Sequence, residues 1–162
     1  MADEDLDFEN SLNIVLVEPE IPGNTGTIGR LCVGLEATLT LIEPLGFSLE
    51  DKHLRRAGLD YWPHLKWQRL PDLESLHRKA PKDSRFYYLT TKSDRPYTHV
   101  NFRPGDFLVF GKETKGLPES LLAANSDTTL TIPMYGNTRS INLAISVGIV
   151  AYEAMRQIKD GF

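Results

Sequence analysis

The chain has 162 residues, of which 41% are hydrophobic and 25% are charged, and these values fit one globular domain with a packed core. No apolar run reaches the roughly 18 residues that a membrane span needs, and the N-terminus lacks the features of a signal peptide, so we expect a soluble, cytoplasmic protein. One cysteine and four scattered histidines exclude an internal disulfide and predict no metal site, while the formal net charge of −4 argues weakly against a nucleic-acid partner.

The N-terminus is the most acidic part of the chain, because the first ten residues hold five of its 22 acidic residues. We therefore expect residues 1–11 to form a solvated, disordered tail before a single domain at 12–162. The remaining 17 acidic residues are balanced by 18 basic ones, so a local basic patch such as 52–56 can still bind phosphate.

Apolar runs rich in branched residues alternate along the chain with segments that carry helix-start signals. In chain order, the first half predicts a strand at Leu12–Val17, a helix capped by Asn24 that ends near Leu35, a strand at Ala37–Ile42, a helix at Glu50–Ala57 and a short strand at Leu65–Gln68. The second half predicts a helix at Pro71–Lys79, strands at Arg85–Leu89 and Asp106–Phe110, a helix at Pro118–Ala124, a strand at Thr128–Ile132 and a long helix at Ser140–Ile158. This alternation predicts the α/β class, with a mostly parallel sheet covered by helices on both faces.

Two of these helices carry further signals. The first holds Cys32 in an apolar stretch, where a buried thiol is expected. The last carries small and apolar residues at i, i+3 and i+4 spacing, namely Ala144, Val147, Gly148, Ala151 and Met155. Such a stripe is typical of a core face, and its small residues also permit the close approach of a partner helix.

Three glycine-bearing loops follow predicted strands, where ligands lie in folds of this class. The first, GNTGTIG at 23–29, imitates a dinucleotide-binding loop, but its G-x-x-G-x-x-G spacing differs from G-x-G-x-x-G and argues against NAD. The second begins Gly111-Lys112-Glu113 and imitates the end of a P-loop, but Glu113 stands where Ser or Thr is needed and would repel phosphate. The third contains Gly136.

Four stretches match a known family in order and spacing: NIVLVEPEIPGNTGTIGRLC (13–32), IEPLGFSLEDKHLRRAGLDYW (42–62), FGKETKGLP (110–118) and IPMYGNTRSINLAISVGIVAYEAMRQ (132–157). On these motifs the chain resembles the SPOUT superfamily of S-adenosylmethionine-dependent RNA methyltransferases. Within it the chain is similar to the TrmL group, which 2'-O-methylates the wobble nucleotide of tRNA. The stretch RRAGLDYW and the absence of an added RNA-binding domain favour this group over the larger ribosomal-RNA members.

The resemblance implies a deep trefoil knot in the C-terminal segment and a homodimer packed through the first and last helices, with Tyr152 at the interface. It implies S-adenosyl-L-methionine as cofactor, S-adenosyl-L-homocysteine as product, tRNA as partner, and no metal. The positions that the resemblance assigns to cofactor binding are Leu89, Thr90, Gly111, Ile132, Met134, Ser140 and Leu143.

The resemblance also marks four catalytic positions, which are Asn24, Arg30, Glu113 and Asn142. Arginine is a poor base because its pKa exceeds about 12, so Arg30 is expected to hold a phosphate or the developing alkoxide while the proton passes to RNA phosphate or water. Glu113 is expected to orient Arg30 or the ribose, and Asn142 to fix the knot turn. Ser140, besides its expected contact with the cofactor, is a candidate for the N-cap of the last helix.

Three arginines are the expected RNA contacts, namely Arg55, Arg56 and Arg139. The expected activity is methylation of the wobble ribose in tRNA-Leu. Two alternatives stay open: a SPOUT 2'-O-methyltransferase for another tRNA position or ribosomal RNA, and a non-catalytic RNA-binding relative. The intact set of polar motif residues argues for catalysis.

Overall fold

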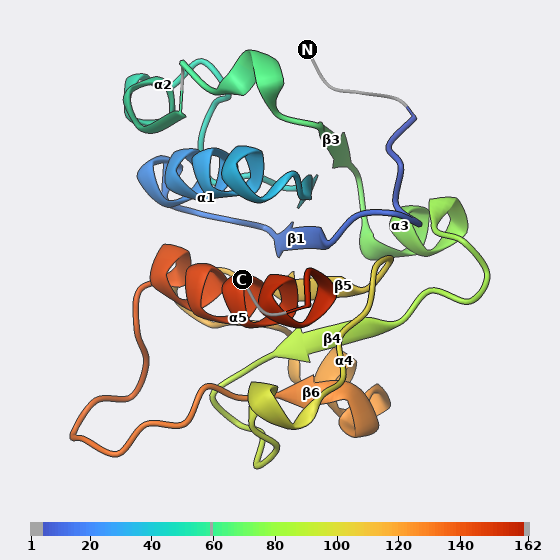
Figure 1. The fold of residues 1–162 in the computed structure, drawn as a ribbon. Coiled ribbons are helices and arrows are strands. Elements are labelled where there is room, and N and C mark those ends of the chain that lie inside the picture. Colours follow the sequence, from blue (N-terminus) through green and yellow to red (C-terminus); the bar gives the residue numbers. More distant parts are fainter. Residues whose placement is uncertain (1–4, 59, 161–162) are drawn as a thin grey trace.

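The computed structural model describes residues 5–58 and 60–160, and in them six parallel strands form one sheet in the order β3-β2-β1-β5-β4-β6 (Figure 1). The strands are β1 (Asn13–Val17), β2 (Thr38–Ile42), β3 (Trp67–Leu70), β4 (Phe86–Leu89), β5 (Phe107–Phe110) and β6 (Thr129–Leu130). The helices are α1 (Pro22–Leu35), α2 (Lys52–Gly58), α3 (Leu73–Lys79), α4 (Glu119–Ala124) and α5 (Leu143–Ile158). The predicted α/β class and parallel sheet are confirmed.

Helices cover both faces of the sheet, and each face has its own apolar core. In β1, Ile14 and Leu16 point to the face covered by α1 and α5, whereas Val15 and Val17 point to the face covered by α3 and α4. All five residues of β1 are buried, because a central parallel strand has no solvent-facing side. The helix α2 packs on α1, farther from the sheet (Figure 1).

The starts of the two long helices differ from the sequence-based expectation. The helix α1 begins at Pro22 and its N-cap is Ile21, without a side-chain cap, so the expectation of Asn24 as cap was wrong by three residues. Proline suits this first position, since its fixed φ is already helical. The helix α5 begins at Leu143, and Asn142 is its N-cap; the expectation of Ser140 as cap was wrong, because Asn142 Oδ1 accepts the amides of Ala144 and Ile145.

Smaller differences concern strand and helix limits. The last strand is shorter than expected, because residues 126–128 form a 3-10 turn and Thr131 makes only an isolated bridge with Pro96. The third strand lies two residues later than expected, at Trp67–Leu70. The helices α2, α3 and α4 begin one or two residues later than expected, and Asp72 caps α3 by accepting the amide of Ser75.

Part of the expected N-terminal tail is packed on the domain. Phe8 is buried, and its ring lies 5.1 Å from that of Phe107, on the α3–α4 face of the sheet. The Phe8 carbonyl also accepts a hydrogen bond of 2.9 Å from Asn13 Nδ2. The packed domain therefore begins before Leu12, while residues 1–4 of the expected tail lie outside the described residues.

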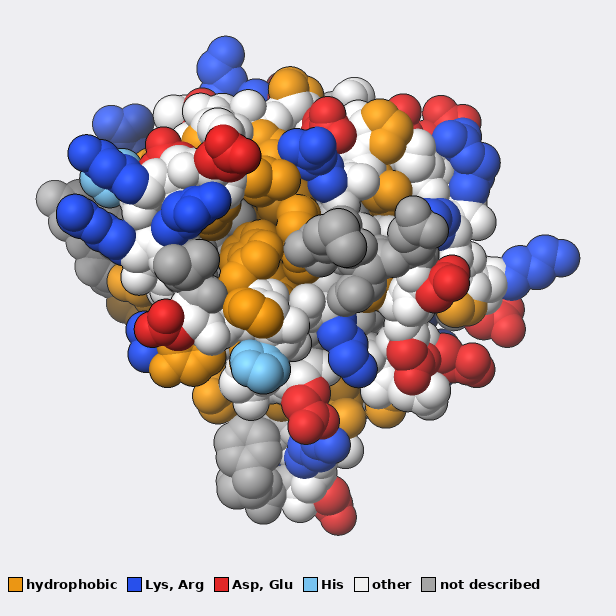
Figure 2. Space-filling model, turned by 90° about the horizontal axis from the view of Figure 1, so that it is seen from above, with side chains coloured by type: hydrophobic (Ala, Val, Ile, Leu, Met, Phe, Trp, Pro, Cys, Tyr) orange, Lys and Arg blue, Asp and Glu red, His pale blue; other side chains and the backbone are white. Residues whose placement is uncertain are grey.

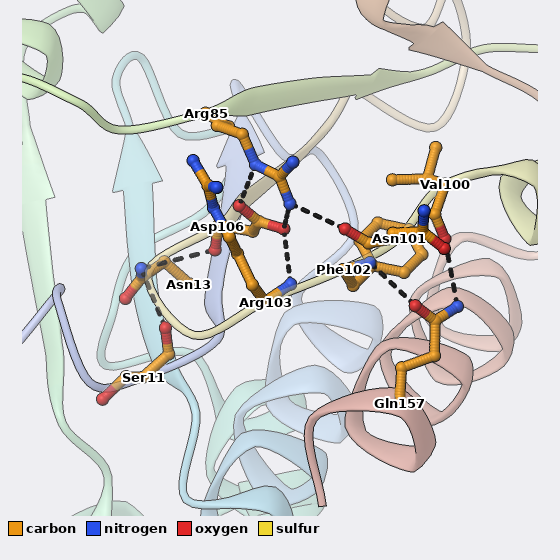
Figure 3. A network of polar contacts seen from close by, with 9 residues as sticks. All are labelled: Ser11, Asn13, Arg85, Val100, Asn101, Phe102, Arg103, Asp106 and Gln157. Atoms are coloured by element: carbon orange, nitrogen blue, oxygen red, sulfur yellow. Dashed lines mark hydrogen bonds and ion pairs between the residues drawn. The ribbon is translucent and has the colours of Figure 1, made fainter. Parts of the chain in front are cut away.

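A polar network closes the amino-terminal edge of the sheet (Figure 3). Asp106 is buried and forms a bidentate ion pair with Arg85, with Nε–Oδ1 and Nη2–Oδ2 distances of 2.8 and 2.7 Å. Its Oδ2 also accepts a hydrogen bond from the backbone amide of Arg103. Gln157, near the end of α5, donates to the carbonyl of Val100 and accepts the amide of Phe102. These contacts join the segment before β5 to β4 and α5.

No helix in the described part of the chain is long and apolar enough to cross a membrane.

Candidate active site

A cavity of about 650 Å³ lies at the carboxyl ends of β4, β5 and β6. These three strands are neighbours in the sheet, and Leu89 is in register with both Phe110 and Leu130, so the loops that follow them converge on one edge. The walls of this cavity include all the residues that the sequence predicted for the cofactor, namely Leu89, Thr90, Gly111, Ile132, Met134, Ser140 and Leu143.

Gly111 lets the chain fold back tightly on one side of the cavity. A Cβ at this position would lie 2.1 Å from the carbonyl carbon of Gly116 and 2.2 Å from the amide nitrogen of Leu117. The loop is closed by a hydrogen bond of 2.9 Å from the Gly116 amide to the Lys112 carbonyl, and Gly116 itself has a φ of +67°. The backbone of Gly116 and Leu117 leaves no space for a side chain, so only glycine fits at 111.

Glu113, from the same loop, caps the segment that enters α1. Its Oε1 accepts the amide of Glu20 at 2.8 Å, and its Oε2 accepts the amide of Ile21 at 2.8 Å and Asn24 Nδ2 at 3.2 Å. A carboxylate suits this place, because these two amides lie just before α1 and the helix dipole favours negative charge there. Glu113 was expected to orient Arg30 or the ribose; its hydrogen bonds here are to Glu20, Ile21 and Asn24, and the expected contact with the ribose stays a prediction.

Glu20 makes the reverse connection. Its Oε1 accepts the backbone amide of Thr114 at 3.0 Å and the Thr114 hydroxyl at 2.7 Å. These hydrogen bonds lower the pKa of Glu20, the side-chain bond having the larger effect. The segments 20–21 and 113–114 are thus held together by bonds in both directions.

Asn24 and Asn142 extend this connection to the start of α5. Asn142 Nδ2 donates to Asn24 Oδ1 at 3.1 Å, and both side chains line the cavity. Three of the four predicted catalytic residues, Asn24, Glu113 and Asn142, are therefore brought together, although they lie up to 118 positions apart in the sequence.

Arg30 is the exception, since it is not among the residues that line the cavity. It lies on the exposed side of α1, where its guanidinium is 4.3 Å from the centre of the Tyr61 ring and donates to the Tyr61 hydroxyl at 2.9 Å. Tyr61 was not singled out from the sequence, although it belongs to the matched stretch RRAGLDYW.

The three predicted RNA contacts separate into two groups. Arg139 lines the cavity, whereas Arg55 and Arg56 are exposed on α2. The view from above in Figure 2 shows Lys and Arg side chains gathered on the left, the side on which Figure 1 places α2. Sequence reasoning also missed Lys92, Lys112 and Lys115, which line the cavity and make its rim basic.

Two ion pairs involve these rim residues. Lys92 contacts Glu119 at 2.9 Å, and Lys112 contacts Glu18 at 3.3 Å.

No group of His, Cys, Asp and Glu in the described residues is arranged to hold a metal ion. Cys32 is fully buried, and burial raises the pKa of its thiol to about 12.

Two of the three glycines in the 23–29 loop, Gly26 and Gly29, serve helix packing. A Cβ at Gly26 would lie 2.6 Å from that of Ala57 on α2, and a Cβ at Gly29 would lie 2.9 Å from the ring of Trp62. Their three-residue spacing places both on the face of α1 that contacts α2 and the following turn. This accounts for two of the three glycines in the pattern that imitates a dinucleotide-binding loop, whereas a Cβ at Gly23 would meet nothing within 4 Å.

A parallel sheet with a cavity at its carboxyl edge, formed by glycine loops and bordered by basic residues, defines an α/β protein with a candidate small-molecule site beside a basic rim. Residues 11–152 match the SpoU rRNA Methylase family, and the chain belongs to this family. It is therefore an S-adenosylmethionine-dependent methyltransferase, and the resemblance predicted from the motifs is confirmed at the family level.

Individual relatives agree with this assignment. The chain is 47% identical to the tRNA (cytidine(34)-2'-O)-methyltransferase of Escherichia coli (strain K12), over 91% of this chain and 94% of the relative. A structure described as "Structural insights into the 2-OH methylation of C/U34 on tRNA" is similar with a TM-score of 0.89 and 42% identity, covering 94% of this chain and 99% of the other. The SpoU methyltransferase AviRb from Streptomyces viridochromogenes, solved with AdoMet, has a TM-score of 0.83 and 26% identity, covering 100% of this chain and 64% of the other.

Proposed function

We propose that the protein transfers a methyl group from S-adenosylmethionine to the 2'-hydroxyl of the wobble nucleotide, position 34, of tRNA. The observation that carries the proposal is the convergence of all the predicted cofactor residues on one cavity. The names of the relatives, which specify cytidine 34 or C/U34 of tRNA, support the substrate.

The cavity fits the cofactor in size and in the chemistry of its walls. Its volume of about 650 Å³ lies within the usual range for small-molecule sites. Leu89, Ile132 and Leu143 offer apolar contacts for an adenine ring, and the tight approach of backbone at Gly111 offers peptide groups to the ribose and the amino-acid part. The cofactor supplies a reactive methyl group on a positively charged sulfur.

The residues around the cavity contribute alignment and charge. The basic rim of Lys92, Lys112, Lys115 and Arg139 attracts the RNA backbone and directs the ribose to the opening. Glu113 is the only carboxylate in the described lining, and its oxygens are occupied by backbone amides and Asn24. The proton of the 2'-hydroxyl therefore passes to RNA phosphate or water.

Arg30 is suited to bind a phosphate next to the reacting nucleotide. It lies six residues beyond Asn24 on α1, which is about 9 Å along the helix axis. An RNA strand that enters the cavity and follows α1 would pass Arg30 and the exposed Arg55 and Arg56 of α2, the helix that packs on α1. A planar guanidinium with several donors suits phosphate recognition.

The test uses unmodified tRNA-Leu transcript, our proposed substrate, with labelled S-adenosylmethionine and nuclease mapping of the methyl group. We expect label on the ribose of nucleotide 34, a strong loss in Arg30→Ala, and normal activity in Arg78→Ala, which removes an exposed arginine on the opposite face of the sheet. An inert transcript, together with inert modified tRNA from a deletion strain, would contradict the substrate and favour ribosomal RNA.

A homodimer through α5 is part of the proposal. Ile145 is 57% exposed and Tyr152 is 47% exposed on one side of this helix, and a side chain at Gly148 between them would meet nothing within 4 Å. By contrast Val147, Ala151 and Met155 are buried in the core. We expect Gly148→Arg to fold but to shift the molecular mass measured by light scattering from dimer to monomer, whereas Ala123→Arg on α4 stays dimeric.

The C-terminal trefoil knot and a cytoplasmic location complete the proposal. The chain runs from the edge strand β6 back to α5, which packs beside α1 over the middle of the sheet (Figure 1). Stretching single molecules by both ends tests the knot, because a tightened knot leaves the extended chain shorter than about 3.5 Å per residue. A full-length extension would contradict the knot.

A further inference from the structure

The hydrogen bonds that join Asn142, Asn24 and Glu113 run in one direction. Asn142 Oδ1 accepts two backbone amides of α5, which can only donate, so its Nδ2 must face Asn24 as a donor. Asn24 Oδ1 accepts this bond, and Asn24 Nδ2 is left to donate to the carboxylate of Glu113. The backbone amides of α5 at one end and the Glu113 carboxylate at the other thus determine the orientations of the Asn142 and Asn24 side chains.

These side chains are placed to hold segments of the chain together and not to contact a reacting hydroxyl. A catalytic acid or base must come within about 2.6–3.2 Å of the reacting hydroxyl. The oxygens of Glu113 instead lie at 2.8 Å from the amides of Glu20 and Ile21, and the oxygen of Asn142 caps α5.

We propose that Glu20, Asn24, Glu113, Thr114 and Asn142 form a clasp that sets the shape of the cofactor cavity, and that they are positioning residues rather than catalytic residues. The inference rests on the proposed function for the identity of the cofactor. The clasp joins the segment that enters α1, the loop after β5 and the start of α5. Since the last two form walls of the cavity, loosening the clasp weakens cofactor binding and leaves the reaction at saturating cofactor largely intact.

Three conservative variants test the clasp. Asn142→Asp keeps an acceptor for the amides of α5 but cannot donate to Asn24, so it separates helix capping from the clasp. Glu113→Gln loses one of the two carboxylate oxygens, and Thr114→Val loses the hydroxyl that binds Glu20. Glu119→Gln is the matched control, because it breaks an ion pair beside the cavity without touching the clasp.

Calorimetric titration with S-adenosylhomocysteine gives the first readout, and steady-state kinetics gives the second. We expect about tenfold weaker binding in Asn142→Asp and Glu113→Gln, which is the effect of losing one hydrogen bond to a well-ordered group. At saturating cofactor, kcat stays within about threefold of the wild type, and Glu119→Gln is unchanged. Wild-type affinity in the clasp variants, or a kcat lowered by about 10²-fold or more as expected for a lost acid–base group, would overturn the inference.

Hydrogen exchange of the ligand-free protein separates failure of the clasp from failure of the proposed function. We expect one of the two amides, that of Glu20 or that of Ile21, to exchange faster in Glu113→Gln than in the wild type, because glutamine keeps only one of the two acceptor oxygens. Unchanged exchange overturns the clasp. Faster exchange in a protein that binds no S-adenosylhomocysteine supports the clasp and overturns the proposed cofactor.

Discussion

At the scale of single residues, Arg30 depends on a partner that no local pattern indicates. Stacking on Tyr61 and a bond to its hydroxyl hold the guanidinium on the outer side of α1. A cation over an exposed aromatic ring contributes about 0.5–1 kcal/mol. Tyr61 thus restricts the directions in which Arg30 can meet a phosphate.

Tyr61→Phe and Tyr61→Leu separate the two contacts. We expect Tyr61→Phe, which keeps the ring, to retain a tRNA KM within about twofold of wild type, and Tyr61→Leu to raise it about three- to fivefold, in line with the loss of a cation–π contact. Steady-state methylation of tRNA at saturating cofactor measures both. A wild-type KM in Tyr61→Leu would show that Arg30 acts without this ring.

Cys32 allows a second prediction at this scale. Its thiol is fully buried with a pKa raised to about 12, so the reactive thiolate is essentially absent at neutral pH. We expect no labelling of the folded protein by iodoacetamide at pH 7.5 and rapid labelling in urea, followed by mass spectrometry. Labelling of the folded protein at the rate of a free thiol would contradict the burial.

At the scale of elements, the glycines of α1 decide how closely α2 can approach. Gly26 faces Ala57 and the carbonyl of Leu54, which leave no room for a Cβ. Gly34, on the same helix, faces open space. The two glycines therefore respond in opposite ways to the same substitution.

Gly34→Ala is expected to stabilise the protein by up to about 1 kcal/mol, because alanine is the better helix former. Gly26→Ala is expected to destabilise it by about 1–3 kcal/mol, because the added methyl displaces α2. Urea unfolding of both variants gives the comparison. Equal shifts in the two variants would mean that α2 does not pack on Gly26.

The ion pair of Asp106 with Arg85 supplies a prediction for the opposite edge of the sheet. Asp106→Ala leaves the Arg85 guanidinium, only 29% exposed, without its partner, and we expect a loss of about 3 kcal/mol in the free energy of unfolding. Arg103→Ala is the control, because Arg103 reaches Asp106 through its backbone amide. Equal free energies of unfolding in the two variants would show that the ion pair does not stabilise the fold.

At the scale of the whole molecule, the net charge of −4 conceals a basic surface. Arg55 and Arg56 lie on α2, and the basic rim lies at the cavity, whereas part of the acidic excess is in the first ten residues. Electrostatic attraction to RNA is local, so its effect appears in the salt dependence of binding.

We expect Arg55→Glu combined with Arg56→Glu to weaken tRNA binding at least about tenfold near 0.1 M salt and to reduce the salt slope by about 2. The affinity for S-adenosylhomocysteine stays unchanged, because neither residue lines the cavity. Arg78→Glu with Lys79→Glu on α3 carries the same charge change on the opposite face and serves as control. Filter binding over a salt series measures all three proteins.

The sequence by itself determined the order of strands and helices, the α/β class, the family and the seven cavity residues proposed for the cofactor. The elements and the class follow from local periodicity, and the family and the cofactor residues follow from the resemblance of the motifs to a known family. Parallel neighbouring strands then bring their loops to one edge. Only the tertiary structure decided that Glu113 accepts the amides of Glu20 and Ile21 just before α1, that Asn142 and not Ser140 caps α5, and that Arg30 pairs with Tyr61. The physical reason is that a side chain bonds the nearest unpaired donor or acceptor in space, and those partners lie in other loops and helices of the chain.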